Sequence, residues 1–150
     1  MKSKLTILSL FLVCLFLFSC GGAKKATVVK TPGVQFTKSK TLTALLDKAE
    51  VENKLVFVDF YTTWCLPCRL MDEEVFPDKR VGDFMNENFI NYKVDAEKAN
   101  GINLAFVYEV SAYPTLLILD AKGRVIEKKI GAAFHDELLT MAERALTGVQ

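Results

Sequence analysis

The sequence feature that most limits what this chain can fold into is the stretch LVFVDFYTTWCLPCRLM, residues 55–71. Its first seven residues are apolar at both alternating positions apart from Asp59, which predicts a central strand that is covered on both faces. A helix should begin at about Cys65, directly after this strand, with Cys68 one turn further along. The stretch therefore predicts a buried strand that leads into a helix with two cysteines in its first turn.

Cysteines at this spacing could form a structural disulfide, half of a metal site or a redox-active pair. Positions i and i+3 lie on one face of a helix, so the two sulfurs can reach disulfide distance without movement of the backbone. A disulfide that closes so short a loop restricts the unfolded chain little, which disfavours a purely structural bond. A tetrahedral zinc site needs about four ligands, and the predicted domain offers only His135 besides these two thiols. We therefore favour a redox pair and expect neither a metal nor another bound cofactor.

The two cysteines should have different roles because they occupy different positions in the first turn. Unpaired amides at a helix N-terminus carry about half a positive charge and stabilise a thiolate there. Cys65, at the exposed end, is therefore expected to be the nucleophile. Cys68, one turn further in, should be the resolving thiol that attacks the mixed disulfide and releases the substrate. Pro67 fits in this turn, where its missing N–H would lack a partner in any case.

The N-terminus has the features of an export signal. Lys2 and Lys4 precede a mostly apolar run of 14 residues, 5–18. A bilayer span needs about 20 apolar residues, so this run fits a signal peptide better. The residues LFSC, which end at Cys20, resemble the lipobox of bacterial lipoproteins, in which the cysteine is lipidated and becomes the mature N-terminus. An uncleaved membrane anchor is the alternative, and either one exports the domain.

We accordingly divide the chain into a signal peptide of the lipoprotein type (residues 1–19), a lipid-anchored tether (20–38) and a folded domain (39–150). The tether lacks helical or strand periodicity, although Val34–Phe36 could join the domain as a short edge strand. The chain is 51% hydrophobic and 25% charged, a balance that suits a globular core. Its net charge of +1 gives no electrostatic reason to expect a nucleic-acid partner.

Periodicity predicts the other elements of the domain. Helices are expected at 41–53, at 65–88 with an interruption at Pro77, at 102–108 and at 134–146, and strands at 55–61, 89–94, 115–119 and 124–130. The residues DAKG at 120–123 predict a turn, so the last two strands should form a hairpin. This order implies an α/β domain, a mixed sheet with helices on both faces. The charge runs at 72–74 and 127–129 are expected on solvated faces.

Three features together resemble the thioredoxin family: the strand with Asp59, the motif WCLPC at 64–68, and the later Tyr113-Pro114-Thr115 that opens a strand hairpin. The likeness covers about residues 39–148. It implies the thioredoxin fold, a central mixed β-sheet flanked by helices on both faces. The longer insert MDEEVFPDKRVGDFMNENF after the motif is similar to the thioredoxin-like domain of membrane thiol-disulfide interchange proteins.

The resemblance implies a catalytic role for Asp59. This carboxylate would accept, through water, the proton of Cys68 when the mixed disulfide resolves. Burial among apolar side chains should raise the pKa of Asp59, because desolvation disfavours its charge. The alternative is a strand-end carboxylate that caps the following turn. Thioredoxins often carry a lysine near this Asp, and Lys93 is a candidate, although its register is not fixed.

Three further residues are expected to bind substrate. Trp64, beside the nucleophile, should form part of the apolar surface around the sulfurs, with a core position as the alternative. The proline equivalent to Pro114 is cis in the family and faces the dithiol, whereas X-Pro bonds in general are cis in only about 5–6% of cases. That bond would turn the backbone of Tyr113 outward, where it could pair with an extended substrate segment.

These observations predict an exported, lipid-anchored protein-disulfide reductase that exchanges disulfides with other envelope proteins, in the periplasm or at the cell surface. A reductant in an oxidising compartment must be recharged, which implies a membrane-bound electron donor. A disulfide oxidant or isomerase is the nearest alternative, since Leu66-Pro67 differs from the Gly-Pro pair most typical of thioredoxins. A non-catalytic binding module on a thioredoxin fold is the alternative from a different class.

Overall fold

The computed structural model describes residues 33–148. The predicted signal peptide, the predicted lipidation site Cys20 and residues 21–32 of the predicted tether lie outside the described residues. None of the helices within residues 33–148 is long and apolar enough to cross a membrane.

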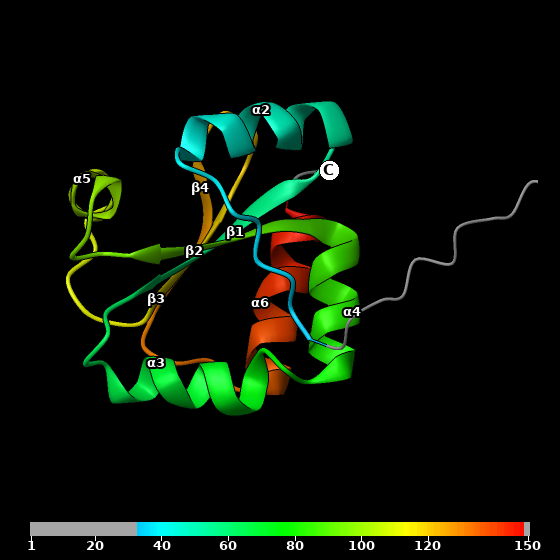
Figure 1. The fold of residues 1–150 in the computed structure, drawn as a ribbon. Helices are drawn as coiled ribbons and strands as arrows, with labels where there is room; N and C mark the ends of the chain where they lie inside the picture. Colours follow the sequence, from blue (N-terminus) through cyan, green and yellow to red (C-terminus); the bar gives the residue numbers. More distant parts are fainter. Residues whose placement is uncertain (1–32, 149–150) are drawn as a thin grey trace, which may run out of the picture. The chain divides into compact units, whose positions relative to one another are not determined.

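Four strands form one mixed sheet (Figure 1): β1, Leu55–Tyr61; β2, Phe89–Asp95; β3, Thr115–Leu119; and β4, Val125–Ile130. Their order across the sheet is β2-β1-β3-β4. β1 pairs in parallel with β2 and in antiparallel with β3, and β3 and β4 form the predicted hairpin. The mixed sheet and its four strands are therefore confirmed.

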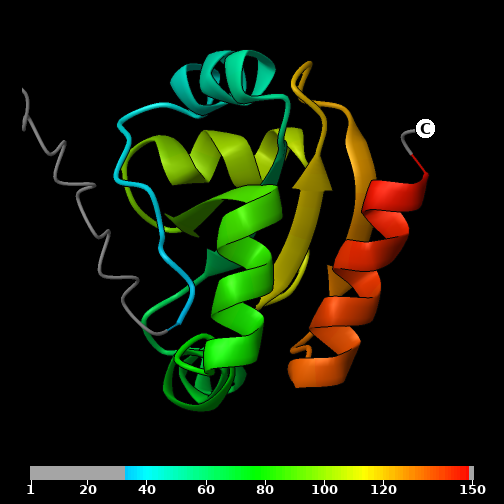
Figure 2. The same cartoon turned by 90° about the vertical axis from the view of Figure 1, so that its right-hand side faces the viewer.

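Helices cover both faces of this sheet. α2 (Leu42–Glu52) and α5 (Asn100–Val107) pack against one face. α4 (Lys79–Asn88) and α6 (His135–Thr147) lie side by side on the other face (Figure 2). The predicted arrangement of helices on both faces is also confirmed.

The central strand β1 is buried because its alternate side chains enter two different apolar clusters. Phe57 packs in the cluster that α4 and α6 cover, whereas Val58 and Phe60 pack in the cluster that α2 and α5 cover. Asp59 follows the alternation of Phe57 and is 1% exposed. The strand thus carries a carboxylate into the interior shortly before the cysteine loop.

The helix after Cys65 is less regular than predicted. α3 (Leu66–Leu70) runs directly into one π-helical segment, η1 (Met71–Val75), in which the N–H of Phe76 donates to the C=O of Met71 at 2.9 Å. Such wide turns occur mostly as single insertions in α-helices, often at functional sites. The segment lies between the turn that carries the cysteines and α4.

Pro77 separates η1 from α4, as predicted, but α4 begins at Lys79 and not at Val81. Asp78 caps this helix, since its Oδ1 accepts from the N–H of Val81 at 3.0 Å. An Asp directly after a helix-breaking proline commonly marks the start of a helix, and this cap places the start of α4 before the predicted one.

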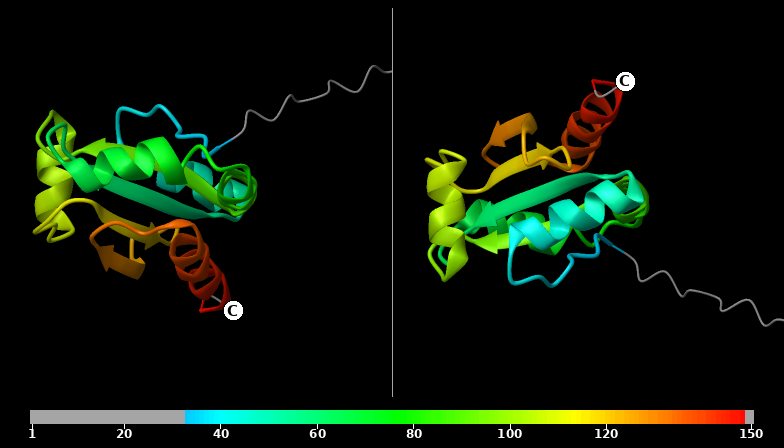
Figure 3. Two further views of the ribbon diagram at one scale, coloured as in Figure 1. Left: turned by 90° about the horizontal axis from the view of Figure 1, so that it is seen from below. Right: turned by 90° about the horizontal axis from the view of Figure 1, so that it is seen from above.

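The last part of the predicted tether lies against the domain. We call residues 33–37 the strap; it runs along the outer side of β2, where Phe36 forms an isolated parallel bridge with Asn91. Figure 3 shows this segment (blue) and β4 (orange) on opposite sides of the sheet. Val34 is buried in the core, so the packed domain includes the strap as well as residues from 39 onwards. The edge strand suggested at Val34–Phe36 is reduced to this one bridge.

Candidate functional site

Cys65 and Cys68 form a disulfide at the start of α3, with their Cα atoms 5.3 Å apart. Cys65 is the N-cap of the helix, and its Sγ accepts from the N–H of Cys68 at 3.2 Å. The N–H of Cys65 in turn donates to the C=O of Thr62 at 3.3 Å, which fixes the loop that joins β1 to α3. The predicted pairing is therefore present, and the helix directs a backbone donor at the first sulfur.

The expectation that Cys65 lies at an exposed end is wrong for this disulfide form. Cys65 is 3% exposed and Cys68 is 2% exposed, so exposure does not distinguish the two cysteines. Both cysteines are buried, while Trp64 and Leu66 beside them are exposed. What distinguishes them is position: Cys65 is the cap and Cys68 lies inside the helix.

Trp64 lies on the surface beside Cys65 and is 68% exposed, so the core position is ruled out. Its indole N–H donates to both carboxylate oxygens of Glu97, at 3.0 and 3.1 Å. Its ring meets that of Tyr113 edge to face, with the ring centres 6.0 Å apart. The contact with Glu97, in the turn between β2 and α5, could not be predicted because the two residues are 33 positions apart in sequence.

The Tyr113-Pro114 peptide bond is cis, as the family resemblance implied. Pro114 is buried and its C=O accepts from the N–H of Gly131 at 2.8 Å. The hydroxyl of Thr115 donates to the C=O of Ala112 at 2.7 Å, which closes the loop before β3. The structure thus brings Trp64, Tyr113 and the loop after β4 to one end of the sheet. Gly131 was not predicted to lie there.

Asp59 faces Lys93 on the neighbouring strand, and its Oδ2 lies 2.8 Å from the Lys93 Nζ. Among residues 33–148, no hydrogen-bond partner reaches its other oxygen, Oδ1. Burial raises the pKa of Asp59 above its usual value; the ammonium of Lys93 opposes this, and the nearby carboxylate of Asp72 adds to it. The register leaves the carboxylate inside the strand and not at its end, which argues against a turn cap.

Lys93 also forms an ion pair with Asp72 in η1. Asp72 was expected on a solvated face; it is exposed, but its carboxylate contacts the ammonium. Burial alone would lower the pKa of Lys93, but the carboxylates of Asp59 and Asp72 outweigh burial and raise it. Lys93 therefore stays charged between one buried and one exposed carboxylate. Within residues 33–148, no group of three His, Cys, Asp or Glu side chains could hold a metal ion.

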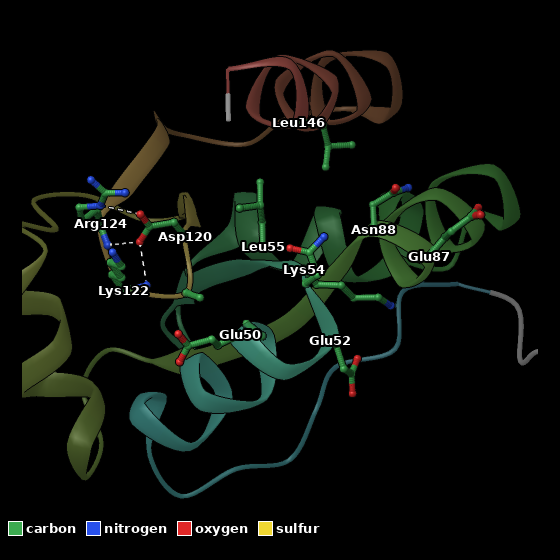
Figure 4. Close-up of a pocket in the computed structure, with 13 residues that line it drawn as sticks. Glu50, Glu52, Lys54, Leu55, Glu87, Asn88, Asp120, Lys122, Arg124 and Leu146 are labelled. Carbon is green, nitrogen blue, oxygen red and sulfur yellow. Dashed lines mark hydrogen bonds and ion pairs between the residues drawn. The ribbon is translucent and has the colours of Figure 1, made fainter. Parts of the chain in front are cut away.

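A separate hollow of about 630 Å³ lies at the opposite end of β1 from the disulfide (Figure 4). Leu55, the first residue of β1, lines it together with Asp120 and Arg124, which form an ion pair. No cysteine lines it. The hollow is therefore not part of the redox site.

Known proteins that are similar to this chain are thioredoxin-like, in agreement with the geometry of the site. A family model named Thioredox_DsbH, described as "Protein of unknown function, DUF255", matches residues 35–115. The thioredoxin of Mycoplasmoides gallisepticum is 36% identical over 104 residues, which are 67% of this chain and 94% of that protein. The chain belongs to the thioredoxin-like family. It has the fold of the thioredoxin-like thiol-disulfide oxidoreductases. Within its motif WCLPC, Cys65 and Cys68 form a disulfide.

Two other relatives bear on the finer classification. The thiol:disulfide interchange protein DsbD of Pseudoalteromonas atlantica is 31% identical over 83 residues, which are 54% of this chain but only 14% of that protein. A solved structure described as a putative disulphide-isomerase from Bacteroides thetaiotaomicron is 40% identical, with a TM-score of 0.68, and covers 77% of this chain and 95% of its own. The first of these is named for thiol-disulfide interchange and the second for disulfide isomerisation.

Proposed function

We propose that this protein is a thiol-disulfide oxidoreductase that reduces disulfides of exported proteins through Cys65 and Cys68. The observation that carries the proposal is the disulfide at the N-terminal end of a helix, directly after a strand that buries Asp59. The similarity to a thioredoxin and to a thiol:disulfide interchange protein supports it.

In the first step, the Cys65 thiolate of the reduced protein attacks one sulfur of a substrate disulfide. A mixed disulfide forms, the substrate S–S bond breaks, and the other substrate sulfur leaves as a thiolate that takes up a proton. The N–H of Cys68, which donates to Cys65 Sγ in the disulfide form, would donate to the thiolate and stabilise its charge. This donor is the structural reason to assign Cys65 as the nucleophile.

In the second step, Cys68 resolves the mixed disulfide. Its thiol loses a proton, its sulfur attacks Cys65 Sγ, and the second substrate thiolate leaves. The protein is left as the Cys65–Cys68 disulfide, and two electrons have passed to the substrate. We assign Asp59 as the acceptor of the Cys68 proton, acting through water. Its carboxylate lies on the sheet face that η1 covers, and the raised pKa makes it a stronger base.

The substrate would lie across the surface made by Trp64 and Tyr113, next to Pro114. The exposed indole of Trp64 offers apolar area, and its bond to Glu97 holds the ring in one orientation. Tyr113 is half-buried and supports the indole edge to face. An extended substrate segment would pair with the backbone of Tyr113, as in strand addition to a sheet edge.

We further propose that the domain is exported and held at a membrane through a lipid on Cys20. The motif that suggests this lies outside the described residues, so the proposal rests on the sequence. The substrates would then be disulfide-containing envelope proteins, and a membrane-bound donor of two electrons would recharge the dithiol.

A disulfide isomerase or oxidant is the second candidate, and the similarity to a putative disulphide-isomerase favours it. Equilibration of the protein with glutathione buffers would separate the two candidates. A reduction potential near about −270 mV would support the reductase, whereas one near about −120 mV would contradict it.

The test of the proposed function is reduction of insulin disulfides with a supplied dithiol reductant. Cys65→Ser should abolish turnover, because the remaining thiol cannot complete the exchange. Cys20→Ser, a matched change of cysteine to serine outside the site, should leave turnover at the wild-type level in detergent. Unchanged turnover in Cys65→Ser would favour the non-catalytic binding module.

A further inference from the structure

The strap is built into the domain by hydrogen bonds on both sides. The N–H of Val34 donates to the C=O of Phe76 at 2.6 Å, and the N–H of Thr37 donates to the C=O of Asn91 at 2.7 Å. Between them, Asn86 accepts from the N–H of Gln35 at 2.7 Å. Asn86 also donates through its side chain to the C=O of Gly33 at 2.9 Å. The strap is therefore held by the residue that caps η1, by α4 and by β2 together.

Two glycines let the strap lie this close to the helices. Gly33 has a φ of +92°, which favours glycine, and a Cβ there would lie 2.6 Å from the carbonyl oxygen of Phe76. A Cβ on Gly82 of α4 would overlap the backbone of Gly33. The close approach of these two backbones fixes where the strap lies against α4, and hence the position of the strap residues that follow.

Phe36 uses this position to cover Lys93. Its ring centre is 5.5 Å from the Lys93 Nζ and 5.0 Å from the ring of Phe76, which it meets edge to face. The rings of Phe76 and Tyr61 lie 5.0 and 4.7 Å from the same nitrogen. Three aromatic rings therefore lie beside the ammonium that is paired with Asp59, and the Lys93 side chain is left only 19% exposed.

We propose that Phe36 is a positioning residue of the redox site: its ring limits the access of water to the Lys93–Asp59 pair and so sets the proton affinity of the Asp59 carboxylate. The strap, which was predicted to be part of the tether, thus belongs to the site, although it is far from the cysteines in sequence. The catalytic consequence rests on the proposed function, in which Asp59 accepts the proton of Cys68.

The charged and titratable groups that face Lys93 are Asp59 and Tyr61 from β1 and Asp72 from η1. A hollow of about 570 Å³ beside Phe36 and Lys93 is also lined by the titratable side chains of Lys38, Lys40 and Tyr92. None of these groups changes when Phe36 is substituted, so the comparison isolates the effect of the ring.

Removal of the ring should lower the titration midpoint of Asp59. Water admitted beside Lys93 would hydrate the ionised carboxylate and relieve the desolvation that raises the pKa of Asp59. The acid limb of the turnover profile should move to lower pH in the same way, because Asp59 must be ionised to accept a proton.

The experiment is an NMR titration of the Asp59 carboxyl carbon in the oxidised protein. Phe36→Ala should lower the midpoint by about half a pH unit or more, and Phe36→Tyr should keep the wild-type value. Phe84→Ala is the matched control, because Phe84 also packs half-buried against the same core cluster but is not among the rings around Lys93. It should lower stability without moving the midpoint.

An unchanged midpoint in Phe36→Ala, or an equal shift in Phe84→Ala, would overturn the proposal. Should Phe36→Ala fail to fold, Phe36→Val, which suits extended backbone, takes its place and must shift the midpoint in the same direction. Insulin reduction by the wild type separates the two proposals. If the Asp59 midpoint shifts in Phe36→Ala but the wild type does not reduce insulin, the proposed enzyme is rejected and this inference stands. If the wild type reduces insulin but the midpoint does not shift, this inference is rejected and the proposed enzyme stands.

Discussion

At the scale of single residues, the site depends on a carboxylate that is costly to ionise. Asp59 is 1% exposed, and only one of its oxygens is paired within residues 33–148. Because its pKa is raised in the folded protein, the folded state holds this proton to a higher pH than the unfolded state does. The contribution of Asp59 to the free energy of unfolding is thus fully present below the pKa that Asp59 has in the unfolded chain. It is lost as pH rises through the pKa that Asp59 has in the folded protein.

Asp59→Asn should therefore stabilise the protein at pH 8 by about 1 kcal/mol, since a neutral side chain replaces the buried charge and Lys93 keeps its pair with Asp72. The gain should shrink as pH falls towards about 4, where the wild-type carboxyl is also neutral. Urea unfolding at both pH values measures this. A variant less stable than the wild type at pH 8 would contradict the account.

The same substitution should slow insulin reduction by about tenfold or more, because Asn cannot accept the proton of Cys68. Steady-state turnover at neutral pH, with folding checked by the unfolding curve, is the measurement. Wild-type turnover in a folded Asp59→Asn protein would make Asp59 a structural residue only.

Single-residue predictions succeeded where a local rule applied. The alternation of β1 places Asp59 inside the sheet, and helical spacing brings Cys65 and Cys68 together. Phe36 and Asp72 were not assigned to the site because they reach Lys93 from segments 57 and 21 positions away. Only the register of β1 on β2 and the path of the strap reveal these contacts, and neither can be read from the local pattern.

At the scale of elements, the strands were predicted well because each is a short apolar run between turn signals. The region after Cys65 was predicted less well. Over only five residues, the spacing of apolar side chains does not distinguish a π-helical segment from an α-helix. The strap was assigned to the tether because its five residues show no periodicity. The strap is held in place by hydrogen bonds to the residue that caps η1, to α4 and to β2, and by the close approach of Gly33 to Gly82.

Gly82→Ala tests this element. Alanine favours a helix interior by up to about 1 kcal/mol over glycine, but here its Cβ would displace the strap backbone. We expect a net loss of about 1 kcal/mol or more in the free energy of unfolding. Urea unfolding is the measurement, with Glu87→Ala on the exposed side of the same helix as control. A stability gain in Gly82→Ala would show that the strap does not pack tightly on α4.

At the scale of the whole molecule, the domain combines an ordinary thioredoxin core with a strap that reaches the redox site through the contact of Phe36 with Lys93. The fold was predictable because strand order, the cysteine motif and the proline before β3 agree with one family. The strap explains why the packed domain starts before residue 39.

Cys20→Ser tests the proposed anchor. Loss of the lipidation site should move the protein from the membrane fraction to the soluble fraction of cells, while the purified variant still reduces insulin. Fractionation followed by immunoblotting measures this, with Cys14→Ser as a matched control that should stay in the membrane fraction. Membrane retention of Cys20→Ser would indicate an uncleaved helix as the anchor.

The central claim, exchange through a nucleophilic Cys65 and a resolving Cys68, is tested most directly by trapping the mixed disulfide. Reduced Cys68→Ser is mixed with a disulfide-bonded protein substrate, and the covalent product is located by mass spectrometry. The account predicts a stable adduct at Cys65, because the thiol that would release the substrate is missing. No adduct in Cys68→Ser, together with a stable adduct at Cys68 in the Cys65→Ser variant, would contradict it.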